Sequence, residues 1–71
     1  MLTTDQIAAM RYARRCDNDP NYPDGETTVR AHARADAGDD PDNLEIVVDE
    51  YLTRYRIGKY LLQTRPDVPL E

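Results

Sequence analysis

The sequence lacks serine, phenylalanine and tryptophan, and it holds one cysteine, one histidine and one lysine. A single cysteine, Cys16, cannot form an intramolecular disulfide. Without serine there is no serine nucleophile, and no glycine-rich phosphate loop is present either. Cys16, His32 and nearby carboxylates match no common zinc spacing. The sequence therefore predicts no catalytic residue, no metal site and no cofactor, and we expect a protein that is not an enzyme.

Long apolar runs are also missing. No stretch approaches the ~20 residues that span a bilayer. The N-terminus lacks the basic start and apolar segment of a signal peptide. A lone thiol fits a reducing compartment. These features predict a cytoplasmic protein with no membrane segment.

The chain has 71 residues, which we expect to form a single small domain over residues 1–71. A chain this short buries a smaller share of its surface than a larger domain does. Such domains usually need a disulfide, a metal or a partner for stability. Because the first two are not expected, the remaining stabiliser is self-association or a protein partner.

Charge is unevenly placed, although the net charge is −5 at pH 7. Residues 1–16 and 51–71 each carry more basic than acidic side chains, whereas residues 17–50 hold eleven acidic and two basic ones. A net acidic chain is repelled by phosphates, so we do not expect nucleic acid as a general partner. The basic ends and acidic middle favour internal pairing or head-to-tail association.

The first helix is predicted over about residues 4–16. Thr3 and Gln6 fit a capping box, in which each side chain satisfies a backbone N–H group at the helix start. Leu2 and Ile7 occupy the two positions of a hydrophobic staple. Arginines follow in the last turns, where the helix dipole favours positive charge.

A loop over residues 17–26 follows, because prolines, asparagines and a glycine are concentrated there. The next helix is predicted over about residues 27–37, with Thr27 or Thr28 as its cap. Its body is rich in alanine and buries little area. Gly38 is the expected stop, because glycine is favoured directly after a helix.

The third helix is predicted over about residues 41–63. Asp40 is the expected N-cap, since Pro41 suits the first helical position and carboxylates are favoured near a helix start. Seven apolar residues share one face at helical spacing. They are Leu44, Val47, Val48, Tyr51, Leu52, Tyr55 and Leu62.

Two features complicate this helix. Ile46, Ile57 and Tyr60 point to the opposite side, so more than one face favours burial. Gly58 either ends the helix early and begins a fourth one, or marks a close helix crossing, because glycine costs a helix interior ~1 kcal/mol relative to alanine. A strand is the weaker alternative, suggested by alternation over residues 54–57.

The overall pattern predicts an all-α fold. We expect a small three-helix domain with a long C-terminal helix, or four helices if Gly58 breaks the last one. Residues 64–71 contain two prolines and predict an extended C-terminal tail.

The sequence disfavours two functional sites, a calcium-binding loop and a nucleophile pair of Cys16 and His32. Asp17, Asp19 and Asn21 match the first ligands of a calcium loop, but Tyr22 replaces the required glycine and Thr28 the closing glutamate. Asx turns explain this loop more simply.

Cys16 and His32 resemble a nucleophile and its base. The sequence supplies no third group to orient them. Nothing local places the two residues together either.

The preferred function is a non-enzymatic protein-interaction or structural module that self-associates or docks through its C-terminal helix. Tyrosine and arginine are enriched at binding hot spots, and both are concentrated near the end of that helix. The predicted interaction surface comprises Tyr51, Arg54, Tyr55, Ile57, Tyr60 and Leu61. Size and composition fit an accessory protein of a phage or mobile element.

Two alternatives stay open. An acidic face could imitate phosphates and inhibit a protein that binds DNA or RNA. Its residues are Asp36, Asp39, Asp40, Asp42, Asp49 and Glu50. Alternatively, the protein is a small helical DNA-binding protein that contacts phosphates through Arg11, Arg14 and Arg15.

Overall fold

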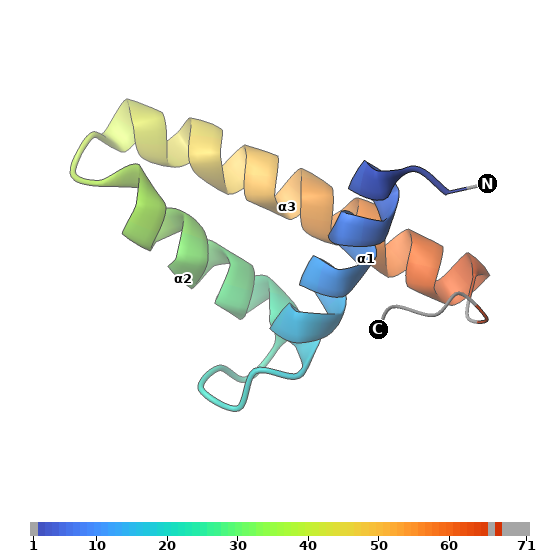
Figure 1. Cartoon of the computed structure of the whole chain (residues 1–71). Helices are drawn as coiled ribbons and strands as arrows, with labels where there is room; N and C mark the ends of the chain where they lie inside the picture. The colour runs from blue at the N-terminus through green and yellow to red at the C-terminus, as the bar shows by residue number, and fades with distance from the viewer. Residues whose placement is uncertain (1, 66, 68–71) are drawn as a thin grey trace.

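The computed structural model describes residues 2–65 and residue 67. It contains three helices, α1 (Thr4–Asp17), α2 (Gly25–Ala37) and α3 (Pro41–Thr64), and no strand within the described residues. Figure 1 shows α2 antiparallel beside the first half of α3, and α1 crossing the second half. The all-α prediction is confirmed. Most of the predicted tail lies outside the described residues.

Helix α1 begins as its sequence predicts. The Thr3 side-chain oxygen accepts a hydrogen bond from the Gln6 backbone N–H at 3.1 Å, and the Thr3 N–H donates to Gln6 Oε1 at 2.8 Å. The capping box is therefore confirmed. Leu2 and Ile7, the predicted staple residues, both pack against the same apolar cluster at the end of α3.

Helix α2 begins two residues earlier than predicted. Asp24 is the N-cap, and its carboxylate accepts a hydrogen bond from the Thr27 N–H at 2.7 Å. Thr27 and Thr28 were the predicted caps, but both lie inside the helix. The prediction was wrong because Asp24 and Gly25 look like a continuation of the loop. The helix ends at Ala37, and Gly38 has a φ of 77°, which suits glycine.

Helix α3 is continuous over 24 residues. Asp40 caps it as predicted, accepting a hydrogen bond from the Asp42 N–H at 3.0 Å, and Pro41 occupies the first turn. The helix runs through Gly58 without a break, so the fold has three helices within the described residues.

Gly58 marks the point where α1 crosses α3. It is buried, and a Cβ atom placed on it would overlap the Ala9 carbonyl oxygen and lie 2.8 Å from the Ala13 Cβ. Ala9 and Ala13 are themselves buried and small. The two backbones approach this closely because all three positions lack a large side chain.

The core has two apolar clusters, one at each side of this crossing. Met10 of α1 and Leu61 of α3 form the first cluster. The second joins all three helices through Cys16, Val29 and Leu52.

Among the described residues, none of the three helices has the length and the apolar composition of a membrane-spanning segment.

Replacing Gly58 with alanine tests the crossing. The substitution removes ~1 kcal/mol of helix penalty but forces a methyl group into the Ala9 backbone, and overpacking costs up to ~3 kcal/mol. We expect Gly58→Ala to lower the free energy of unfolding by about 2 kcal/mol in urea denaturation. The matched control is Gln63→Ala, at an exposed position of the same helix outside the contact with α1. Equal or greater stability of Gly58→Ala would contradict the crossing.

Candidate interaction surface

A line of exposed side chains follows the outer side of α3, which the other two helices leave uncovered. It consists of Ile46, Thr53, Ile57 and Tyr60, which we call the outer stripe. The exposed fractions of the three large apolar residues are 57% for Ile46, 46% for Ile57 and 65% for Tyr60. At about 100° and 1.5 Å per residue, these positions lie within about 60° of one another over roughly 21 Å.

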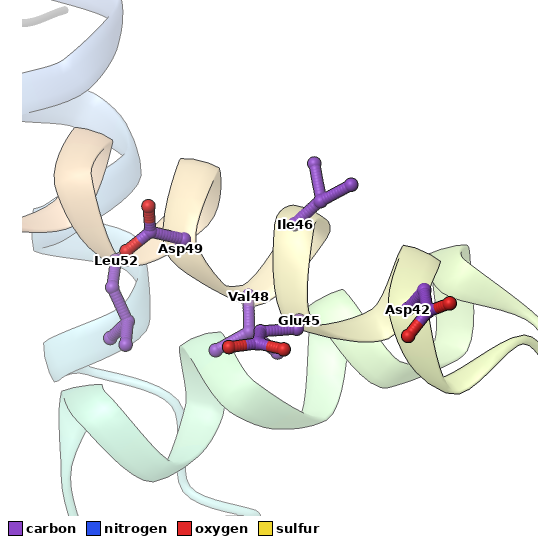
Figure 2. A pocket seen from close by; sticks show the side chains of 6 residues that line it. All are labelled: Asp42, Glu45, Ile46, Val48, Asp49 and Leu52. Atoms are coloured by element: carbon purple, nitrogen blue, oxygen red, sulfur yellow. The ribbon is translucent and has the colours of Figure 1, made fainter.

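The stripe exists because the opposite side of α3 already has two neighbours. Leu52 and Leu61 are buried against the other helices, and Val48 packs against the second apolar cluster. Figure 2 shows Val48 pointing toward α2 and Ile46 pointing away from it. The apolar residues of α3 are therefore divided between a packed face and an exposed one.

Shallow grooves flank the outer stripe on both sides. One runs along the first half of α3 and is lined by Asp42, Glu45, Ile46, Val48, Asp49 and Leu52 (Figure 2). The other lies between α1 and α3, with Gln6 and Ala8 on one wall and Thr53 and Ile57 on the other. Both grooves are open to solvent.

The residues of the predicted interaction surface do not share one face. Arg54, Ile57 and Tyr60 are exposed. Leu61 is only 8% exposed and belongs to the core beside Met10.

The two other tyrosines of that predicted surface are partly buried and hold helices together. Tyr51 donates a hydrogen bond to the Asp36 carboxylate on α2 and meets the Tyr12 ring edge-on, with ring centroids 6.1 Å apart. Tyr55 contacts the end of α1.

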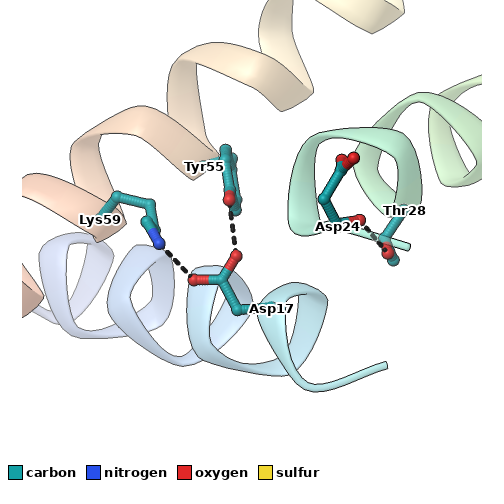
Figure 3. Close-up of polar contacts among 5 residues, drawn as sticks. All are labelled: Asp17, Asp24, Thr28, Tyr55 and Lys59. Atoms are coloured by element: carbon teal, nitrogen blue, oxygen red, sulfur yellow. Dashed lines mark hydrogen bonds and ion pairs between the residues drawn. The ribbon is translucent and has the colours of Figure 1, made fainter. Parts of the chain in front are cut away.

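Tyr55 belongs to a polar cluster that ties α1 to α3. The Asp17 carboxylate accepts hydrogen bonds from the Tyr55 hydroxyl and the Lys59 ammonium group, each at 2.6 Å (Figure 3). The Lys59 nitrogen also lies 5.9 Å from the centre of the Tyr55 ring. An aspartate at a helix C-terminus is opposed by the dipole, so Lys59 offsets an unfavourable charge.

Sequence reasoning did not find this cluster. Asp17 and Lys59 are 42 positions apart, and no local pattern links them. Gly25 completes the site, since a Cβ atom there would overlap the Asp17 carboxylate and the Tyr55 hydroxyl. The sequence placed Gly25 in a predicted polar loop and gave no signal of this close packing.

The predicted acidic face divides into two groups. Asp49 and Glu50 are exposed at the middle of α3. The other four, Asp36, Asp39, Asp40 and Asp42, lie around the turn between α2 and α3. Asp36 accepts the Tyr51 hydrogen bond and Asp40 caps α3, so part of this group has a structural use.

Cys16 is buried, with 1% of its surface exposed, and burial raises the pKa of its thiol. His32 is half-buried, and its Nδ1 atom lies 3.4 Å from the Tyr12 hydroxyl. Burial also raises the pKa of Tyr12. The Cys16 thiol and the Tyr12 hydroxyl are therefore protonated near neutral pH, and a protonated thiol is a poor nucleophile.

The loop between α1 and α2 forms an Asx turn. The Asp19 carboxylate accepts a hydrogen bond from the Asn21 N–H at 2.9 Å. In the part of the chain that the structure describes, no group of three metal-binding side chains is gathered in one place.

Comparison of the chain with protein families, curated proteins and solved structures found no match. No family is therefore assigned. Function is inferred from the outer stripe and the groups around it.

The raised pKa values of the buried thiol and of two partly buried tyrosine hydroxyls predict that the protein loses stability at alkaline pH. Burial raises the pKa of Tyr12, Tyr55 and Cys16 above their unfolded values. The folded state then binds more protons than the unfolded state above about pH 9, so the free energy of unfolding falls as pH rises. We expect urea denaturation to show constant stability up to about pH 8 and a decline toward about pH 11.

Tyr55→Phe, compared with Tyr60→Phe, isolates one contribution to this decline. Tyr55 also donates its hydroxyl proton to Asp17, whereas Tyr60 is exposed. We expect a shallower decline in Tyr55→Phe and an unchanged one in Tyr60→Phe. Stability that stays flat up to about pH 11 would contradict the assignment.

Proposed function

We propose that the protein is a non-enzymatic interaction module that binds another protein molecule through the outer stripe of α3. One observation carries this proposal. Ile46, Ile57 and Tyr60 are exposed in line on a helix whose other face is already packed. Isolated exposed apolar residues are ordinary, but aligned ones bordered by polar residues are typical of binding surfaces.

The placement of Cys16 and His32 supports a non-enzymatic role. Cys16 is enclosed by Val29 and Leu52, where a substrate has no access. His32 contacts Tyr12 rather than an exposed group. Both residues are better explained by packing than by chemistry.

The acidic-decoy alternative has weaker support. A phosphate mimic needs carboxylates spread along one surface, whereas four of the six candidates surround one turn. Asp36 and Asp40 are also engaged in hydrogen bonds within the fold.

On composition alone, we also propose that the protein is cytoplasmic and is an accessory protein of a phage or mobile element.

Photo-crosslinking in the cells that produce the protein tests the proposal. A benzophenone amino acid at position 57 lies on the outer stripe, and the same group at position 34 lies on an exposed part of α2. We expect position 57 to give a discrete protein adduct, either with a second copy or with another protein. Position 34 should give none. Absence of a discrete adduct at position 57, or the same adduct at both positions, would contradict the proposal.

A further inference from the structure

We infer that the molecule covering the outer stripe is a second copy of this chain, with the two α3 helices packed antiparallel about a two-fold axis near Thr53. This inference rests on the proposed function, because it names the partner of the same surface. A two-fold interface requires a surface complementary to itself. The charges and apolar residues of α3 meet that requirement.

Charge along the outer side of α3 changes sign at its middle. The first half presents Asp42, Asp49 and Glu50, and the second half presents Arg54 and Arg56. All five residues are exposed. Neither Asp49 nor Arg56 forms an ion pair with another described residue. The charges of two such helices are complementary only when the second helix runs in the opposite direction to the first.

The helical positions of these charges fit an antiparallel pair. At about 100° per residue, Asp49 and Arg56 lie on the same flank of the stripe, within about 20° of each other. Glu50 and Arg54 lie on the opposite flank. A two-fold axis perpendicular to both helices brings like flanks together. Each flank therefore places a carboxylate opposite an arginine of the second copy, and each pairing occurs twice.

A parallel pair has the reverse property. Its two-fold axis runs along the helices and brings opposite flanks together, which would set Asp49 beside Glu50 of the second copy, and Arg56 beside Arg54. Like charges set against each other across an interface repel and weaken binding. The charge pattern thus selects the antiparallel arrangement.

The apolar residues follow the same symmetry. Ile46 lies seven positions before Thr53 and Tyr60 lies seven after it, so turning the helix about Thr53 sets each opposite the other. Ile57 packs beside them. Thr53 is small and stands near the axis, which permits a close approach of the two helices. The groove between α1 and α3 adds further contact area beside the stripe.

Charge reversal combined with sedimentation equilibrium tests this arrangement. The wild-type chain should form dimers. Asp49→Arg alone and Arg56→Asp alone each create two repulsive contacts and should raise the dimer dissociation constant at least about tenfold. The double variant Asp49→Arg/Arg56→Asp restores both pairs and should return the constant to within about threefold of wild type. Arg34→Glu, an exposed change on α2, should leave it unchanged.

Two results would overturn the inference. The first is a wild-type chain that stays monomeric up to about 1 mM. The second is a double variant no tighter than the single ones, which would exclude the antiparallel pairing. A monomeric chain that still gives an adduct with a different protein at position 57 would remove only the second copy as partner. Absence of any adduct at position 57 would remove the proposed function itself.

Discussion

The close contact between the α1 and α3 backbones at Gly58 is the constraint on which the fold depends. Because Gly58, Ala9 and Ala13 carry no large side chains, α1 crosses α3 without bending it. Because α1 crosses α3, one helix of 24 residues packs against two neighbours, α2 along its first half and α1 along its second. A glycine that weakens an isolated helix thus stabilises the assembled one.

The outer stripe is a consequence of this arrangement. Two short helices cover only one side of a helix roughly 36 Å long, and four of their buried residues are alanines, Ala9, Ala13, Ala33 and Ala37. The side chains that α1 and α2 do not reach include Ile46, Ile57 and Tyr60. A larger domain would cover such residues with another element. The described residues form no further element that covers them, and we therefore propose that a partner does so.

Local sequence signals predicted where α1 and α3 begin, but not the start of α2 at Asp24 and Gly25. The capping box of α1 and the N-cap and proline of α3 depend on residues within one turn, so Thr3, Gln6 and Asp40 could be identified directly. Contacts between residues that are far apart in the sequence could not be predicted from such signals. Lys59 and Asp17 pair across two helices, and the choice between a break and a crossing at Gly58 depended on what packs against it.

The exposure of residues on the interaction surface could not be predicted either, because it also depends on contacts between distant parts of the chain. The sequence identified the apolar and aromatic residues of α3 but not the neighbours that cover them. Leu61 and Ile57 are both apolar and lie near the same end of the helix, yet one is buried and the other exposed. Leu61 is buried because it packs against Met10 of α1, a residue far away in the sequence.

Amide hydrogen exchange across Gly58 tests the central claim most directly, because a helix supported by α1 exchanges slowly only where it remains intact. Amides of residues 56–62 should be protected as strongly as those of residues 48–54. Rapid exchange beginning at Gly58 would show that the helix breaks there and that α1 does not hold the two halves in line.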